Sequence, residues 1–538
     1  MTGLGLASPF GRRRSSVNVQ QAAHHLLDWD FMDQGRRSLT HQTIAGLLWT
    51  AGGKGAYGVL QLVVLAILAR LLTPADFGTV SAALIVIGLS GIVSQLGMGP
   101  ALVQRSELER RHIDTAFSAS VTLDTLLGAA IWLGSPFVSR FFRSGDVEPV
   151  LRALAWVFPL QGLATVAESL MKRELRFRSL ANLDVISYGA GYGLVGITLA
   201  LLGHGVWALV AAQIAQNVIK TAILLSWQPP RLRRLPEWRA FRDLMHFGGG
   251  FTVAKIANQA AAQGDYLVVG RFLGPAPLGY YGRAFNLMSA PASGFGTILD
   301  AVLFPAMARV QANATRLAAA YRRGVALIAL IFLPTSLVLM LLAPEVVALM
   351  LGPHWTPVVA PLQVLAAGMM FRASSQIADS LTRATGSVYR RAWRQILYAG
   401  LVVGGAWIGQ HWGITAVALG VLFAIITNFL FMAHLSLSDT RTTWGELWRA
   451  HVPALLIALV AGPLVWGTAT ALRHWTLPPL VVLIAGGLVM LGVALLLALV
   501  APATFLGADG QWMVGTLRDF MRKVIRPAAQ PAGSPAGD

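Results

Sequence analysis

Charged side chains that interrupt long apolar segments are the residues of this sequence best suited to bind an ionic substrate. Lys54 and Lys255 lie 201 positions apart (255 minus 54), each inside such a segment. Charge is costly inside a membrane and is usually kept there for a function. Two ammonium groups facing one cavity would attract an anion such as a diphosphate. The alternative is that each lysine is neutralised by a carboxylate in its own half of the chain, and Asp124 has a suitable depth to neutralise Lys54.

Four more charges fall in apolar segments of the second half of the chain. Asp265 and Arg283 have only apolar residues 201 positions earlier, so both charges are missing together from the first half. We expect them to pair, either as a structural ion pair or in an outer gate or ion-coupling site. Arg372 precedes Asp379 by seven residues, on about the same helical face. It could contact a substrate, which we favour, or simply pair with Asp379.

Other intramembrane charges lie nearer to the ends of apolar segments. Glu168 and Asp184 could carry a transported proton, although pairing with the neighbouring Lys172 and Arg173 is the simpler interpretation. Long basic side chains near helix ends commonly reach toward lipid headgroups. We expect this of three residues: Arg70, Lys220 and Arg271.

The composition identifies the class of protein that carries these charges. Of 538 residues, 55% are hydrophobic and 12% are charged, and the mean hydropathy is +0.61. Such a chain is a polytopic membrane protein. The net charge of +18 does not indicate nucleic-acid binding, because the basic residues gather in alternate short loops. With no cysteine, the chain has neither disulfides nor thiolate metal sites.

Hydrophobic segments predict an all-α polytopic membrane protein with about fourteen transmembrane helices. The segments are 44–71, 77–97, 114–134, 148–170, 179–202, 206–226, 244–270, 277–307, 320–342, 357–380, 392–410, 413–435, 450–471 and 478–501. Alternate connections hold nearly all the lysine and arginine, whereas the others hold only Arg140, Arg143 and Arg473. The positive-inside rule therefore places both termini in the cytoplasm.

A duplicated motif divides the chain into two lobes. Arg70–Gly78 reads RLLTPADFG, and Arg271–Gly279 reads RFLGPAPLG. Repeats with an even number of helices run parallel and can share a site at their interface. The predicted divisions are a basic cytoplasmic tail (1–43), the N-lobe of helices 1–6 (44–227), a basic cytoplasmic linker (228–243), the C-lobe of helices 7–12 (244–440), helices 13–14 (441–502), and a cytoplasmic amphipathic helix with a disordered tail (503–538).

Motifs for catalysis are absent from the sequence. GGKG at Gly52–Gly55 lacks the spacing and the hydroxyl residue of a phosphate-binding loop. No HExxH zinc motif or G-x-S-x-G nucleophile elbow occurs, and the outer connections are too short for a catalytic domain. We expect a protein that is not an enzyme and holds neither a metal nor another cofactor.

Two strings of this sequence resemble one transporter family. RLLTPADFG with TVSAALIVIGLSGIVSQLGMGPALVQR, and GDYLVVGRFLGPAPLGYYGRAFNLMSAP, are similar to Wzx-like polysaccharide exporters of the polysaccharide transporter family. That family belongs to the multidrug/oligosaccharidyl-lipid/polysaccharide superfamily, and the colanic-acid and teichuronic-acid exporters are its most similar branch. The resemblance implies a MATE-like arrangement of two six-helix lobes around a central cavity, here with two extra C-terminal helices.

The resemblance also implies a function. A protein of this kind translocates undecaprenyl-diphosphate-linked oligosaccharide across the bacterial inner membrane by alternating access, for exopolysaccharide, capsule or lipopolysaccharide synthesis. Membrane lipids surround it, and a polymerase and chain-length or export proteins of the pathway would be its partners. A cationic cavity implied by the resemblance would use Lys54, Lys255, Arg283 and Arg372. Coupling to a proton or sodium gradient would use Asp124 and Asp265.

Two other functions fit a chain of this class. A cation-coupled MATE-type drug exporter would favour acidic cavity residues, and the deep charges here are at least as basic as acidic. A lipid II-type flippase or scaffold in cell-wall assembly would be essential for viability. Loss of surface polysaccharide without loss of viability would favour the exporter of lipid-linked oligosaccharide.

Overall fold

The computed structural model describes residues 55–95, 98–105, 107–229, 259 and 263–525. These residues form helices and contain no β-strand, which confirms the all-α prediction for the described part of the chain. Each of the fourteen predicted segments overlaps a described helix, and ten described helices are long and apolar enough to span a membrane. The structure is therefore compatible with fourteen spans. Lys54 and Lys255 lie outside the described residues.

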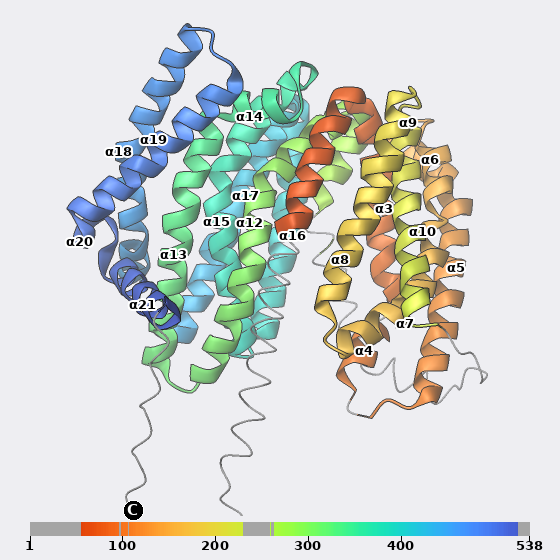
Figure 1. Ribbon diagram of the computed structural model, residues 1–538, viewed down its shortest axis with the longest axis horizontal. Coiled ribbons are helices and arrows are strands. Elements are labelled where there is room, and N and C mark those ends of the chain that lie inside the picture. Colours follow the sequence, from red (N-terminus) through yellow and green to blue (C-terminus); the bar gives the residue numbers. More distant parts are fainter. Residues whose placement is uncertain (1–54, 96–97, 106, 230–258, 260–262, 526–538) are drawn as a thin grey trace, which may run out of the picture.

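The N-lobe contains the first half of the duplication and lies on the right in Figure 1. Its elements are the helix Gly55–Leu71, α3 (Pro74–Gln95), α4 (Met98–Gln104), α5 (Arg110–Phe142), α6 (Val147–Leu154), α7 (Val157–Arg173), α8 (Phe177–Tyr188), the π-helix η1 (Gly189–Gly196), α9 (Ile197–Leu201) and α10 (Val206–Trp227). The helix α8 lies on the side of this lobe that faces the C-lobe. Together α8, η1 and α9 form one continuous helical segment, Phe177–Leu201.

The C-lobe and the last helices form the other half of the molecule. Their elements are the helix 263–272, α12 (Pro275–Val310), α13 (Ala314–Leu341), α14 (Ala343–Met350), the 3₁₀ helix η2 (Pro353–Val358), α15 (Val359–Ala384), α16 (Val388–Gly409), the 3₁₀ helix η3 (Gln410–Trp412), α17 (Ile414–Thr440), α18 (Trp444–His474), α19 (Pro479–Val500), α20 (Pro502–Phe505) and α21 (Gly507–Ile525). Outside the duplication, α18 packs on α13, and α19 packs on α18 and α14. These two helices therefore widen the C-lobe only.

The amphipathic helix predicted within 503–538 is α21, which begins at Gly507 and ends at Ile525. It returns to α13, where Asp509 pairs with Arg322 at 2.9 Å and the Arg323 guanidinium lies 3.7 Å from the Trp512 ring centroid. The first half of α21 therefore packs against the chain's own helix α13.

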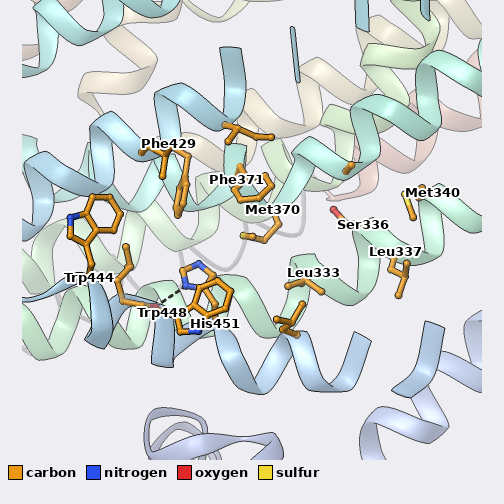
Figure 2. Close-up of a pocket in the computed structure, with 15 residues that line it drawn as sticks. Leu333, Ser336, Leu337, Met340, Met370, Phe371, Phe429, Trp444, Trp448 and His451 are labelled. Carbon is orange, nitrogen blue, oxygen red and sulfur yellow. Dashed lines mark hydrogen bonds between the residues drawn. The ribbon is translucent and has the colours of Figure 1, made fainter. Parts of the chain in front are cut away.

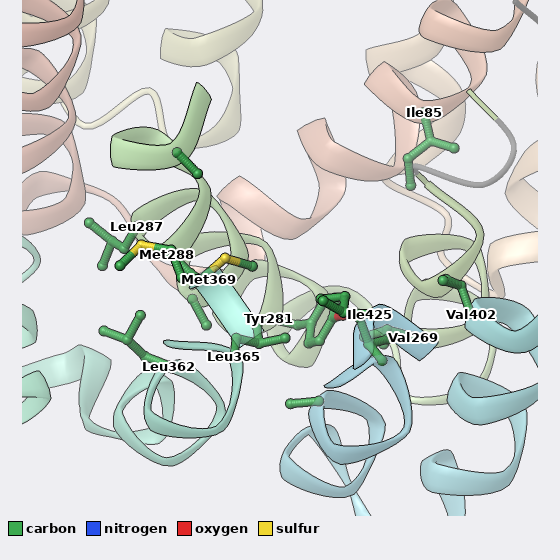
Figure 3. Close-up of a cluster of buried hydrophobic side chains, with 14 of the residues drawn as sticks. Ile85, Val269, Tyr281, Leu287, Met288, Leu362, Leu365, Met369, Val402 and Ile425 are labelled. Carbon is green, nitrogen blue, oxygen red and sulfur yellow. The ribbon is translucent and has the colours of Figure 1, made fainter. Parts of the chain in front are cut away.

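Close packing inside the C-lobe centres on α12 and α15. Figure 3 shows Tyr281 of α12 among Leu365, Met369 and Ile425, all of them almost fully buried. Within a membrane, helices associate through such packing and through small residues that let backbones approach, because lipid is as apolar as the side chains. This core fixes α12, which carries the candidate site.

The two lobes meet through the duplicated motif, at the end of the molecule opposite to the basic loops. We call the end of the molecule that carries the basic loops the basic end. The N-terminal turns of α3 and α12 cross so closely that a Cβ atom on Gly78 would lie 1.7 Å from the Pro275 carbonyl oxygen. A Cβ on Gly279 would lie 2.0 Å from the Pro74 carbonyl oxygen. Only glycine allows this contact, and the two repeats supply it reciprocally.

The arginines of the motif reinforce the same contact. Arg70 Nη2 donates to the Leu349 carbonyl at 2.7 Å, and Arg271 Nη1 donates to the Phe141 carbonyl at 2.6 Å. Both carbonyls belong to the last turn of a helix of the other lobe, where backbone acceptors lack partners within the helix. We expected these arginines near lipid headgroups, and the structure shows that each also crosses to the other lobe. We call the two glycine contacts and the two arginine contacts the interlobe seam.

Candidate functional site

Three of the predicted site residues lie near one another on helices of the C-lobe. They are Asp265 on the helix 263–272, Arg283 on α12 and Arg372 in the middle of α15. Asp124 lies elsewhere, inside the N-lobe. The roles predicted for Lys54 and Lys255 remain predictions, since both fall outside the described residues.

Asp265 is held by neutral hydrogen-bond donors. Its side chain is 1% exposed, the Tyr281 hydroxyl donates to Oδ2 at 2.5 Å, and the backbone N–H of Tyr266 donates to Oδ1 at 3.0 Å. Arg372 interacts with it electrostatically without an ion pair between them. Buried carboxylates need such donors, because desolvation without a partner costs several kcal/mol.

Arg283 does not pair with Asp265, so this prediction is wrong. Tyr281 occupies the carboxylate, and Arg283, two residues later, points about 200° away around α12. Its guanidinium carbon lies 4.7 Å from the ring centroid of Phe77 in the N-lobe. Among the described residues, its Nε has no hydrogen-bond partner. Arg283 is therefore a C-lobe cation directed at the N-lobe.

Arg372 does not pair with Asp379 either. Asp379 lies about 10 Å further along the axis of α15 than Arg372. It forms ion pairs with Arg383 at 3.5 Å and with Arg391. The Arg372 guanidinium lies 5.2 Å from the Phe285 ring centroid and interacts with the hydroxyl of Tyr398. Pairing with Asp379, the alternative role for Arg372, is therefore excluded. The guanidinium of Arg372 keeps its capacity to bind an anion.

Asp124 is buried in the N-lobe, between α5 and α7. It is 1% exposed and packs so closely on Gly162 that a Cβ there would lie 3.0 Å from the Asp124 Cβ. The structure does not bring it to Asp265 or Arg283. Its predicted pairing with Lys54 involves a residue outside the described part and stays a prediction.

A chain of ion pairs lies in the half of the N-lobe nearer to the basic end. Lys220 of α10 contacts Asp184 at 3.0 Å and Glu168 at 3.3 Å, and Lys172 contacts Glu168 at 2.7 Å. The predicted pairing of Glu168 with Lys172 is confirmed. We expected Lys220 at the headgroups. Instead it joins α10 to both α7 and α8, because Glu168 and Asp184 lie within its reach.

A set of tyrosines and amides in the N-lobe was not predicted from the sequence. The rings of Tyr188 and Tyr192 are stacked with centroids 4.9 Å apart, and Tyr57 meets Tyr188 edge-on at 5.3 Å. The Tyr192 hydroxyl donates to Gln213 Oε1 at 2.6 Å. Their spacing was a usable signal, since Tyr188 and Tyr192 follow Asp184 at four-residue intervals.

An apolar pocket of about 530 Å³ opens between α13, α15, α17 and α18 (Figure 2). Leucine, methionine, phenylalanine and tryptophan side chains form most of its wall, and no charged residue lines it. His451 is 7% exposed, and its Nδ1 lies 2.8 Å from the Leu447 carbonyl. Its Nε2 has no hydrogen-bond partner among the described residues.

Metal binding finds no support in the described residues, which contain no group of three or more His, Asp or Glu side chains placed to hold an ion. The chemistry available at the lobe interface is therefore that of guanidinium groups, aromatic rings, amides and one neutral-donor-bound carboxylate. Such a set can bind an anionic, polar ligand.

Proteins that synthesise or export polysaccharides are similar to this chain. Lipopolysaccharide biosynthesis protein WzxC of Escherichia coli (strain K12) is 24% identical, over 85% of this chain and 89% of its own. Teichuronic acid biosynthesis protein TuaB of Bacillus subtilis (strain 168) is 22% identical, over 82% and 92%. Succinoglycan biosynthesis transport protein ExoT of Rhizobium meliloti (strain 1021) is 26% identical, over 77% and 89%.

Solved structures share the fold. Lipid II flippase MurJ in an inward closed conformation matches with a TM-score of 0.68 at 12% identity, over 84% of this chain and 99% of its own. An inward-facing MATE family multidrug transporter matches with a TM-score of 0.52 at 18% identity, over 75% and 95%. The predicted MATE-like arrangement of two lobes is confirmed. A family model described as polysaccharide biosynthesis protein matches residues 67–360, more than half of the 538, and the chain belongs to that family.

Proposed function

We propose that this protein is a flippase that moves undecaprenyl-diphosphate-linked oligosaccharide across the bacterial inner membrane for the synthesis of a surface polysaccharide. The names of its relatives place them in lipopolysaccharide, teichuronic acid and succinoglycan biosynthesis, the last as a transport protein. A fold shared with a lipid II flippase suits a diphosphate-linked lipid.

The observation that carries the proposal is the pair Arg283 and Arg372. Both guanidinium groups lie deep in the molecule over aromatic rings, and neither forms an ion pair with a described carboxylate. Guanidinium is a planar, permanently charged donor that suits phosphate oxygens. Bound there, the diphosphate would be neutralised while its hydrocarbon chain stayed in the bilayer, which lowers the cost of crossing.

The interlobe seam supplies the moving part of an alternating-access cycle. By the positive-inside rule the basic end faces the cytoplasm, so the seam lies at the outer face. Release outward then requires the crossing of α3 and α12 to separate. Gradient coupling fits Asp265, whose neutral donors let it gain a proton without breaking an ion pair, and Asp124 is the second candidate.

The direct test combines a deletion strain with arginine variants. We expect the deletion to accumulate lipid-linked oligosaccharide and to lose surface polysaccharide, and Arg283→Ala and Arg372→Ala to fail to restore it although the proteins insert. Arg316→Ala, an exposed position on α13, is the matched control and should restore export. Normal export by both site variants would remove the cationic site from the mechanism.

The same strains separate the two other functions. Increased drug susceptibility of the deletion strain with normal surface polysaccharide would support the drug exporter. Loss of viability on depletion, with normal lipid-linked oligosaccharide levels, would support a role in cell-wall assembly. We expect neither result.

A further inference from the structure

We propose that the N-lobe binds the sugar portion of the substrate through a band of tyrosines and amides that selects the oligosaccharide. We call this set the tyrosine–amide band: Tyr57, Tyr188, Tyr192, Gln213 and Gln216. The inference rests on the proposed function, because it assumes a lipid diphosphate that carries sugars. It adds a site for the part of the substrate that the arginines do not recognise.

The aromatic rings of the band pack against one another, with Tyr188 buried and Tyr57 and Tyr192 partly exposed. Tyr188 and Tyr192 are stacked with an interplanar angle of 17°, and Tyr57 meets Tyr188 at 72°. Aromatic side chains with a polar end offer a rigid apolar face beside a hydrogen-bonding group. A pyranose ring has the matching surfaces, since its C–H faces are apolar and its edge carries hydroxyl groups.

The amides supply the hydrogen bonds that sugar hydroxyls need. The Tyr192 hydroxyl donates to Gln213 at 2.6 Å, and Tyr57 lies within interacting distance of Gln216. Gln213, Gln216 and Lys220 share one face of α10 by their spacing of three and four residues. Amides inside a membrane span are expensive unless they are satisfied, which makes a cluster of them a candidate pathway for polar ligands.

The band lies next to the proposed phosphate site. Arg283 reaches from the C-lobe to within electrostatic interaction of Tyr188 and Tyr192, and its guanidinium covers Phe77. A diphosphate held by Arg283 would therefore place its first sugar beside these rings. The covalent order of the substrate, diphosphate then sugar, matches the order of the two sites.

The backbone of η1 directs the tyrosines to this face. A Cβ on Gly191 would lie 2.7 Å from the Gln216 Cβ, and one on Gly196 would lie 3.0 Å from the Ala212 Cβ. These glycines let the π-helix lie directly against α10, while Tyr192 comes from the same eight-residue segment. π-helical segments are rare and occur frequently at functional sites.

Charge argues for sugars over cationic drugs as the ligand of the band. Two carboxylates lie between the band and the basic end, Glu168 and Asp184, and both are already neutralised by Lys172 and Lys220. A cation would have to displace a lysine from them, whereas sugar hydroxyls need only the neutral amides and phenols.

The test compares two ligands that differ only in their sugars. Purified full-length protein is titrated with undecaprenyl diphosphate and with lipid-linked oligosaccharide extracted from cells that lack the protein. We expect Tyr192→Leu and Gln216→Leu to lose about tenfold in affinity for the oligosaccharide lipid, and to bind undecaprenyl diphosphate as the wild type does. Tyr192→Phe, which keeps the ring, should lose less than Tyr192→Leu.

Controls and contrary outcomes are defined by the same titrations. Gln363→Leu and Tyr321→Phe, matched substitutions in the C-lobe, should bind both ligands normally. Equal losses for both ligands, or none, in the band variants would overturn the sugar site while leaving the flippase intact. Wild-type protein that binds neither ligand would overturn the proposed function itself, together with this inference. If Tyr192→Leu does not accumulate, Gln216→Leu gives the same comparison.

Discussion

The two lobes are alike where they touch and unlike where they face the substrate. At the interlobe seam, Arg70 and Gly78 of one repeat make the same contacts as Arg271 and Gly279 of the other. Deeper in the molecule, Asp265 and Arg283 belong to the C-lobe alone, and stacked tyrosines belong to the N-lobe. A seam between duplicated halves benefits from two-fold symmetry. A lipid-linked oligosaccharide has none, because its lipid and sugar ends differ, so its binding residues need not be duplicated.

The sixth helices of the lobes show the difference most clearly. In the N-lobe, α10 carries Gln213, Gln216 and Lys220 within its span. In the C-lobe, α17 is more apolar, buries Val417 and Val421 in its first turns, and lines the apolar pocket. One lobe therefore offers polar recognition, and the other offers hydrocarbon-like volume.

Valine at Gly78 or Gly279 should have the largest effect, and an equal one in the two lobes. Each side chain would collide with a backbone carbonyl that cannot rotate away, and such overpacking costs about 1–3 kcal/mol or more. We expect both variants to separate the seam and to lose export. A single cysteine at Ser81, in a chain that otherwise has none, should then react faster with an external thiol reagent.

Gly91→Val is the matched control for these variants. Gly91 lies on α3, as Gly78 does, and no atom of another described residue lies within 4 Å of its Cβ position. We expect it to leave export and Ser81→Cys labelling unchanged. A defect in Gly78→Val but not in Gly279→Val would show that the seam is functionally asymmetric despite its symmetric contacts.

The duplicated strings made the two lobes predictable, because similar sequences at one offset should fold alike. They also placed Arg70 and Arg271 at helix ends. They could not show that each arginine reaches the other lobe, since the relevant acceptors, Leu349 and Phe141, are backbone carbonyls that any residue provides. Backbone partners leave no mark on the sequence.

The sequence predicted how deep in the membrane the charged residues of the candidate site lie, and it did not predict which partners their side chains contact. Residue spacing located Asp265, Arg283 and Arg372 within the membrane, and of the three only Arg283 contacts the N-lobe. The pairing failed because Tyr281, two residues before Arg283, takes the Asp265 carboxylate. Tyr188 and Tyr192 were overlooked because tyrosine in an apolar helix is ordinary, and the π-helix η1, which follows Tyr188 and contains Tyr192, has no sequence signature beyond its glycines.

Lys220→Met should have the next largest effect, confined to the N-lobe. Removing the lysine leaves Asp184 unpaired and deprives Glu168 of one partner in a half-buried place, which we expect to cost about 2 kcal/mol. The melting temperature of the purified protein should fall. Adding Asp184→Asn and Glu168→Gln should recover most of the loss. Failure of this triple variant to recover would mean that Lys220 stabilises the lobe by packing and not by charge.

Alanine at Arg70 or Arg271 should act more mildly, again equally in both lobes. Arg70→Ala removes one charge-assisted hydrogen bond, and Arg271→Ala removes a short one to Phe141 and a longer one to the Arg140 carbonyl at 3.4 Å; each loss is worth about 1 kcal/mol after screening by solvent. The Ser81→Cys labelling rate should rise about fivefold. An effect in one variant only would assign the work of closing the seam to that lobe.

His451→Leu should have the smallest effect and tests the apolar side of the comparison. The imidazole Nε2 has no partner among the described residues, so replacing the ring by a hydrocarbon removes an unsatisfied group from an apolar wall. We expect a change within about 1 kcal/mol in the free energy of unfolding and unchanged export. Full stability with lost export would give the C-lobe pocket a polar role through His451. The contrast between a polar N-lobe and an apolar C-lobe would then be one of degree, with each lobe contributing hydrogen bonds to the substrate.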